Sequence, residues 1–244
     1  MKAERVAGGW KLNGAKAWIT NAAVAGLSIA YAQTDRSQGY RGIACFAIEA
    51  ERPGFQRDTP FELHGGHAIG VGGFRLVDYI APDEALLHPP GAAFKSALAG
   101  INGARTYVAA MCCGMLHAAL ETAVRYTGQR QTFGQKVIEH QGVRWKLVDA
   151  ATDLEAARLL TYRAARLIDE GKDAVLPAAH AKKFATDMAL QRIADCIQAM
   201  GANGLRAEYP LARHLAGAKI AAYTDGSIEM MNERIGAALP QVFG

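Results

Sequence analysis

The chain has 244 residues, half of them hydrophobic and a fifth charged, with a formal net charge of +4. A chain of this size can bury a sizeable core as one large domain or two ordinary ones. Its basic residues are scattered among acidic ones, so nothing points to nucleic acid. We find no apolar run as long as a membrane span and no apolar signal-peptide core near the start, which predicts a soluble, cytoplasmic protein without membrane attachment.

The cysteines argue against metal binding and against a disulfide framework. There are four, Cys45, Cys112, Cys113 and Cys196. No CxxC or His-Cys spacing appears, so we expect neither a zinc site nor paired cysteines.

The first 90 residues have the pattern of β-strands. Residues 11–20 read KLNGAKAWIT, which predicts a hairpin with its turn at Asn13-Gly14. Further strand-length apolar runs lie at 28–34, 42–48 and 74–80, so residues 1–90 are expected to form a mainly antiparallel β domain. The glycine-rich stretch 65–73 has the look of a phosphate-binding loop. Because a strand-like run follows it instead of a helix, bulges and close packing explain it better.

Residues 91–244 have helical periodicity. Apolar residues recur at helical spacing in alanine- and leucine-rich segments, which predicts helices at 92–129, 138–170, 176–200, 208–223 and 227–239. The second helix carries an apolar stripe made of Val143, Leu147, Ala150, Leu154, Ala157 and Thr161. Short glycine- or proline-marked loops join the helices, as in a bundle. The predicted fold class is therefore α+β.

Asp225 lies in an Asp-Gly-Ser turn just before the last predicted helix, and its position has two interpretations. Asp225 or Ser227 could cap the helix by accepting hydrogen bonds from its first free N–H groups. Alternatively, the carboxylate of Asp225 could take a proton from a bound substrate.

Several motifs along the chain together indicate a family. They are WITN at Trp18 to Asn21, Arg-x-x-Phe-Gly from Arg130 followed by Gln141, Gln-x-x-Gly-x-x-Gly from Gln198, EYP from Glu208, and AKI from Ala218 before the Asp225 turn. With these motifs in this order, nearly the whole chain resembles the acyl-CoA dehydrogenases. The resemblance implies a barrel-like β domain (1–90, incomplete at its start) followed by an up-down four-helix bundle (91–244), bound FAD, and α,β-desaturation of an acyl-CoA thioester. It also implies a homotetramer or dimer, electron-transferring flavoprotein as partner, and the mitochondrial matrix if the source is eukaryotic.

The resemblance also assigns roles to residues. The residues expected to flank the flavin ring are Trp18, Ile19 and Thr20. Those expected to contact the FAD diphosphate and adenine are Arg130, Gln131, Thr132, His140 and Gln141, and the remaining cofactor contacts are Gln198, Gly201, Ala202, Ser227, Ile228 and Glu229. The residues expected to contact the substrate are Asn102, Arg105 and Gly226. Simpler structural alternatives are a core position for Trp18, a solvated helix-end cation at Arg130, and an ion pair at Arg105.

Asp225 occupies the position of the family's catalytic glutamate, which makes it the expected base. Aspartate is one methylene shorter, so its carboxylate falls roughly 1.5 Å short of a glutamate's reach. The other position that carries the base in some members is Ala104 here, and the helix carries Glu229 and Glu233 away from the turn. Two alternatives to a dehydrogenase remain: a flavin oxidase or monooxygenase of the same fold, or a truncated, non-catalytic assembly subunit.

The sequence departs from the family pattern in three places. The leading helical domain and the flavin-binding strand segment that follows it are not in this sequence, so part of the flavin pocket and one wall of the acyl tunnel are expected to come from outside it. Ala216-Gly217 stands where the family commonly has Arg-Asp. Ala237 stands where a CoA-contacting arginine often lies, and both changes put CoA affinity in question.

Overall fold

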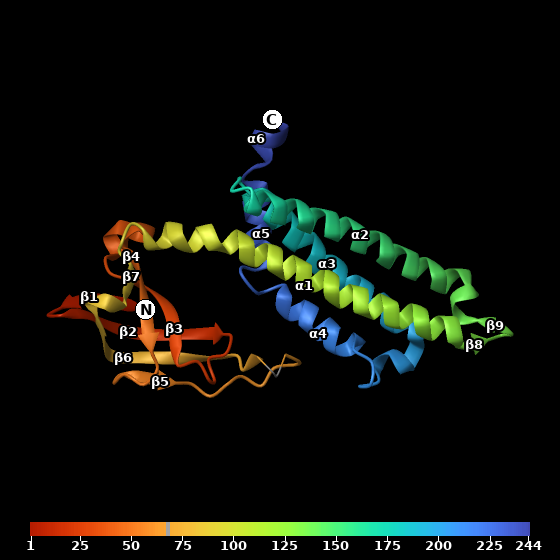
Figure 1. Cartoon of the computed structure of the whole chain (residues 1–244), viewed down its shortest axis with the longest axis horizontal. Coiled ribbons are helices and arrows are strands. Elements are labelled where there is room, and N and C mark those ends of the chain that lie inside the picture. The colour runs from red at the N-terminus through yellow and green to blue at the C-terminus, as the bar shows by residue number, and fades with distance from the viewer. Residues whose placement is uncertain (67–68) are drawn as a thin grey trace. The chain divides into compact units, whose positions relative to one another are not determined.

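The computed structural model describes residues 1–66 and 69–244, and it divides the chain into two compact units, Met1–Gly100 and Ile101–Gly244. Figure 1 shows the strands of the first unit and the helices of the second. The predicted α+β class is therefore confirmed. Positions 67 and 68, in the glycine-rich stretch 65–73, lie outside the described residues. Elsewhere in that stretch close packing is confirmed, because a Cβ on Gly73 would stand 2.5 Å from the carbonyl oxygen of Lys16.

The described strands of Met1–Gly100 form one seven-stranded sheet in the order β5-β6-β2-β1-β3-β4-β7. Their bounds are β1 Lys2–Val6, β2 Gly9–Ile19, β3 Leu27–Gln33, β4 Ile43–Glu49, β5 Phe55–Arg57, β6 Gly72–Pro82 and β7 Leu86–His88. Neighbouring strands run antiparallel, apart from β1 and β3, which are parallel where Lys2 faces Gln33. The predicted antiparallel character holds, and short 3₁₀ turns span Arg36–Gly42 and Asp83–Ala85.

The predicted hairpin turn at Asn13-Gly14 is wrong. The turn lies earlier, where Val6 of β1 faces Gly9 of β2, and Asn13-Gly14 is an irregularity inside the continuous strand β2. The side-chain oxygen of Asn13 accepts a hydrogen bond from the backbone N–H of Asp78 at 2.8 Å. Pairing with β6 thus uses the Asn-Gly pair as a bulge, because cross-strand contacts override a local turn preference.

Aromatic and branched side chains fill the core of this unit. The largest fully buried ones are Leu12, Phe46, Ile48, Phe74 and Tyr79. The Tyr79 hydroxyl also accepts a hydrogen bond from the backbone N–H of Glu49 at 2.9 Å, which satisfies its polar end. The strand interiors are therefore fixed both by apolar burial and by a hydrogen bond across the sheet.

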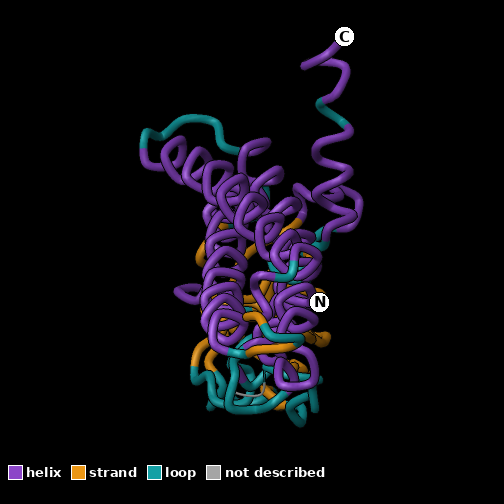
Figure 2. Tube along the Cα trace, turned by 90° about the vertical axis from the view of Figure 1, so that its right-hand side faces the viewer, coloured by secondary structure: helices purple, strands orange, loops and turns teal. Residues whose placement is uncertain are grey.

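Helices dominate Ile101–Gly244. Their bounds are α1 Ala93–Gln129, α2 Gln141–Asp169, α3 Val175–Met200, α4 Leu211–Ala221, α5 Ile228–Gly236 and α6 Leu239–Phe243, with 3₁₀ turns at Val137–Glu139 and Gly201–Leu205 and a small β8–β9 hairpin, Gln131–Thr132 with Gln135–Lys136. The five predicted helices are confirmed with shifted ends, and the last one stops at Gly236. Figure 2 shows most helices of this unit running alongside one another, with the C-terminal end projecting away from them.

The bundle core is made largely of small side chains. Residues 147, 150, 154, 157 and 161 of the predicted α2 stripe are buried, and Val143 packs partly against the same core. Helices α1, α3 and α4 contribute mostly alanine, cysteine and methionine to this core. Small side chains let helix backbones approach closely, which brings α3 near the turn that precedes α5.

Helix α1 corrects the expectation about apolar runs. By length and composition alone it could cross a membrane, with a mean hydropathy of 1.4 over 18 residues. Its side chains Val108, Cys112 and Leu116 are buried in the core of the bundle. The apolar face of α1 is therefore used in packing against the neighbouring helices.

Candidate active site

Asp225 lies in the turn between α4 and α5, and its backbone is in the left-handed region. Its φ is 54° and that of Gly226 is 100°. Aspartate tolerates this region better than most residues because its short polar side chain can be accommodated there, whereas glycine pays no steric cost. Both residues are half-buried. The turn therefore holds the aspartate in an unusual but permitted conformation.

The cap interpretation finds no support at this helix. Ser227 occupies the N-cap position of α5 without a side-chain hydrogen bond to the helix backbone. Its hydroxyl instead bonds to the Glu229 carboxylate, which lowers the pKa of Glu229. Among the hydrogen bonds of the described residues, none uses the Asp225 carboxylate. The carboxylate is thus left available at the turn.

The backbone of this turn is tied down by two side-chain cations. The Lys182 ammonium donates hydrogen bonds to the carbonyl oxygens of Thr224 and Gly226. The Arg105 guanidinium donates from Nε to the carbonyl oxygen of Asp225 at 3.4 Å. Three successive carbonyls, centred on Asp225, therefore each face a positive charge.

Arg105 reaches the turn from α1 and is almost completely buried, with 4% of its surface exposed. Burial, and then the nearby charge of Arg234, lower the pKa of Arg105, while Asp225 opposes that shift. A Cβ on Gly226 would lie 3.6 Å from Arg105 Nη2, an ordinary contact distance, so the φ of 100° and not a lack of space favours glycine here. Of the three expected substrate residues, the structure joins Arg105 and Gly226 at the turn. Asn102 lies one helical turn earlier on α1, where its carbonyl accepts from the Thr106 hydroxyl at 2.8 Å.

Lys182 is a site residue that sequence reasoning missed. It is fully buried on α3, in a helix face otherwise lined by alanines such as Ala178 and Ala185. A lysine four residues after one buried alanine and three before another breaks an apolar stripe. This interruption could have indicated a buried lysine with a specific partner, because lysine is almost never fully buried without one.

A second cluster of expected residues forms a cleft of about 450 Å³ at the β8–β9 end of the bundle. It brings together six residues predicted to meet the cofactor: Arg130, Thr132, His140, Gln198, Gly201 and Ala202. Gln131 and Gln141 are exposed and do not line the cleft. Arg130 is exposed just beyond the end of α1, where it lines the cleft.

His140 joins the β8–β9 hairpin to the start of α2. Its Nε2 lies 3.0 Å from the Thr132 hydroxyl and 3.2 Å from the Thr132 carbonyl oxygen. Its Nδ1 lies 2.9 Å from the side-chain amide nitrogen of Gln135. The ring is therefore held between the two strands of the hairpin.

The cleft also contains residues that sequence reasoning missed. The Asn203 amide donates to the Tyr126 hydroxyl at 2.7 Å, which ties the Gln198–Gly204 helix end to α1. Phe133, inside the Arg-x-x-Phe-Gly motif, is 98% exposed. Its backbone has a φ of 51°, in the left-handed region that bulky side chains rarely adopt.

In the first unit, the core interpretation of Trp18 is wrong. Its side chain is 70% exposed, its φ is 61°, and it follows a register shift between β2 and β6. Ile19 is half-buried and Thr20 exposed beside it. The Trp18 ring lies 4.8 Å from that of Phe61, centre to centre. The bulge turns the indole outward, where it packs against the ring of Phe61.

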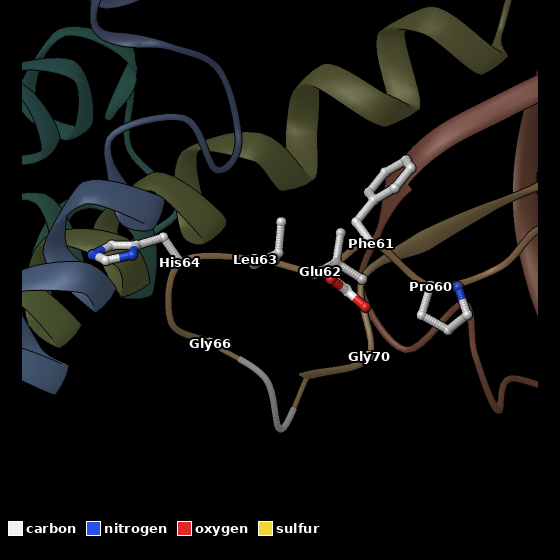
Figure 3. Close-up of a pocket in the computed structure, with 8 residues that line it drawn as sticks. Pro60, Phe61, Glu62, Leu63, His64, Gly66 and Gly70 are labelled. Carbon is white, nitrogen blue, oxygen red and sulfur yellow. The ribbon is translucent and has the colours of Figure 1, made fainter.

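A pocket of about 640 Å³ lies next to Phe61, along the loop from Pro60 to Val71 (Figure 3). Figure 3 shows Pro60 and His64 on opposite sides of this pocket, with the Glu62 carboxylate between them. None of these residues was predicted to be functional. Among the described residues, no group of three or more His, Cys, Asp or Glu side chains is placed to hold a metal ion.

Comparison with known proteins shows the family of the chain. The acyl-CoA dehydrogenase middle domain matches residues 1–78, and the acyl-CoA dehydrogenase C-terminal domain matches residues 92–239. The short-chain specific acyl-CoA dehydrogenase of Megasphaera elsdenii is 38% identical over 232 residues, which are 95% of this chain and 61% of that protein.

Solved structures agree with the sequence comparison. Butyryl-CoA dehydrogenase from Megasphaera elsdenii superposes with a TM-score of 0.94 at 36% identity, covering 98% of this chain and 62% of that one. PigA, solved with FAD and proline, gives 0.94 at 29% identity, covering 98% and 62%. The chain spans about three fifths of the length of these relatives. The chain belongs to the acyl-CoA dehydrogenase family, and it contains the middle and C-terminal domains of that family.

Proposed function

We propose that this chain is part of an FAD-dependent acyl-CoA dehydrogenase in which Asp225 removes the α proton of an acyl-CoA thioester. The observation that carries the proposal is the Asp225 turn, which leaves a half-buried carboxylate without a hydrogen-bond partner among the described residues while cations bind the carbonyls around it. A general base must be free to accept a proton and fixed in position. The Asp225 turn meets both requirements.

The residues of this chain divide the chemistry between them. The Asp225 carboxylate takes the α proton, and Arg105 and Lys182 hold the backbone that carries it. Among the described residues the backbone N–H groups of Ser227 and Ile228, at the start of α5, have no hydrogen-bond acceptor and can donate to a polar group above the turn. When bound, FAD supplies the acceptor for the hydride that leaves the β carbon.

The cleft at the β8–β9 end fits the cofactor that this family implies. Its donor set combines the Arg130 guanidinium, the Thr132 hydroxyl and the Gln198 amide, which suit phosphate oxygens and an adenine edge. Gly201 faces open space, with no heavy atom within 4 Å of where a Cβ would stand, so a flat ligand can approach the backbone there. These features support the assignment of Arg130, Thr132, His140, Gln198, Gly201 and Ala202 to FAD.

The partners follow from the same reasoning. A homo-oligomer is proposed on the strength of the family, and the exposed ring of Phe133 at the edge of the cleft is available for contact with a second copy. We assign electron-transferring flavoprotein as the electron acceptor on the strength of the family. The short reach of Asp225 favours an acyl group whose α carbon lies close to the turn, such as a branched or cyclic one.

Asp225→Asn tests the assignment of the base. Asparagine also tolerates a positive φ, so the turn should keep its shape and the free energy of unfolding should change by less than about 1 kcal/mol. We expect FAD binding to persist and flavin bleaching by acyl-CoA under nitrogen to be lost. Glu233→Gln, on the same helix and exposed, is the matched control and should bleach normally.

An Asn variant that bleaches at the wild-type rate would refute the role of Asp225. Rapid reoxidation of the reduced flavin by oxygen alone would instead favour the oxidase alternative. A chain that neither binds FAD nor is stabilised by it would favour the assembly-subunit alternative, because a true cofactor site raises the melting temperature once the ligand exceeds its dissociation constant.

A further inference from the structure

Lys182 is a fully buried cation on a helix face that is otherwise apolar. Taking an ammonium ion out of water costs several kcal/mol, and a methionine of similar length would avoid that cost. A buried charge at such a position requires compensation from its partners. The partners of Lys182 therefore indicate what it does.

Those partners are backbone atoms on both sides of Asp225. The ammonium has three donors, and two of them bind the carbonyl oxygens of Thr224 and Gly226. The groups that face the ammonium are Asp225 in the turn and Arg105 and Cys112 on α1. The lysine thus binds the carbonyls of the residues immediately before and after Asp225, and the Asp225 carboxylate is not its hydrogen-bond acceptor.

We propose that Lys182 is a positioning residue: its ammonium clamps the carbonyls on either side of Asp225 and so sets where the Asp225 carboxylate points. The proposal rests on the function proposed above. An aspartate has only two side-chain torsions and a short reach, so the place of its carboxylate is set mainly by its backbone. Rigid support of that backbone matters more here than it would for a longer side chain.

The charge of the clamp supports this role. Burial lowers the pKa of Lys182 from its ordinary 10.5 to about 8, with Asp225 opposing that shift and Arg105 adding to it. The ammonium is therefore charged at neutral pH in spite of its burial. A charged donor holds a carbonyl oxygen more strongly than a neutral one does.

Hydrogen exchange of the turn tests the clamp directly in the full chain, without any need for activity. In Lys182→Met, the amides of residues 223–229 should exchange at least tenfold faster, while those in the middle of α2 keep their protection. Lys182→Arg keeps a charged donor and should stay within about threefold of wild type. Lys183→Met is the matched control, because the adjacent Lys183 pairs with Asp187 at the surface, and it should leave the turn unchanged.

Two results of this experiment would overturn the proposal. One is turn exchange in Lys182→Met equal to that of wild type. The other is an equal rise in the Met and Arg variants, which would assign the effect to side-chain volume rather than to hydrogen bonding. Amine labelling of the wild type covers the case in which the Met variant does not fold: Lys182 should resist acylation while Lys183 reacts, and equal labelling would refute the buried clamp.

Kinetics separate this proposal from the one on which it rests. If Asp225 is the base, Lys182→Met should lower kcat at least tenfold with little change in KM, and Lys182→Arg should recover most of the rate. If Asp225→Asn remains active, the proposed function fails while the exchange result still decides the clamp. If Asp225→Asn is inactive and Lys182→Met has both wild-type exchange and wild-type kcat, only the clamp fails.

Discussion

Gly204 offers a sharp test of how tightly the Gln198–Gly204 helix end is packed. A Cβ at this buried position would stand 2.8 Å from the carbonyl oxygen of Ile197 and 2.9 Å from its Cα. Both are backbone atoms of the last turn of α3, so they cannot rotate out of the way as a side chain would. Gly204→Ala must therefore shift the helix end.

The expected cost of Gly204→Ala is about 1–3 kcal/mol of unfolding free energy, the usual range for overpacking. The matched control is Gly114→Ala in the middle of α1, where a Cβ would meet nothing within 4 Å. Alanine is a better helix former than glycine by roughly 1 kcal/mol, so this control should stabilise the chain. The same chemical change thus has opposite expected signs at the two sites.

Urea unfolding followed by far-UV circular dichroism measures both variants against wild type. Comparable slopes with denaturant concentration would show that the change lies in stability and not in the extent of unfolding. A neutral or stabilising Gly204→Ala would refute the argument, because it would mean that the helix end moves freely. A destabilising Gly114→Ala would show that open space around a glycine is a poor guide in this chain.

Two further predictions concern pH and the cofactor cleft. The pKa of Lys182 is lowered from 10.5 to about 8 in the folded chain. Between about pH 8 and pH 10.5 the unfolded chain therefore binds more protons than the folded chain. The contribution of Lys182 to the free energy of unfolding should rise with pH across that window. Urea unfolding at pH 8, 9 and 10 should therefore show the stability of wild type rising relative to Lys182→Met, and a constant difference would contradict this reasoning. Tyr126→Phe removes the acceptor of the Asn203 amide and should cost about 1 kcal/mol in thermal or urea unfolding. A Phe variant as stable as wild type would mean that water replaces the tyrosine hydroxyl at no cost.

Much of the fold could be predicted from the sequence because its periodicities are strong. The stripe on α2 marks a helix with one buried face, and the structure buries that face. The Asn13-Gly14 pair failed as a hairpin signal because two-residue turn propensity is local, whereas the long pairing of β2 with β6 depends on residues about 65 positions away. No short window contains that information.

The sites show the same division between local and distant information. The position of Asp225 in a turn before α5 could be predicted from the sequence, and its candidate role came from the family resemblance, while Arg130 and Gly201 became candidates through short motifs. Lys182 could not be linked to Asp225 by spacing, because the acceptors of its ammonium lie 42 and 44 residues further along the chain. The family pattern suggested which residues contact ligands, but it did not indicate that Lys182 binds the backbone of the Asp225 turn.

The Asp225 turn has a consequence for protein engineering. Since its shape depends on a lysine of α3 and an arginine of α1, residues 222–228 are not a portable motif. A graft of this heptapeptide onto another helical scaffold would carry the acid without its supports. A functional graft has to include all three segments: the turn, the α3 segment with the lysine and the α1 segment with the arginine. A mutant library that varies only the turn keeps the supporting lysine and arginine unchanged, although the best turn sequence depends on them.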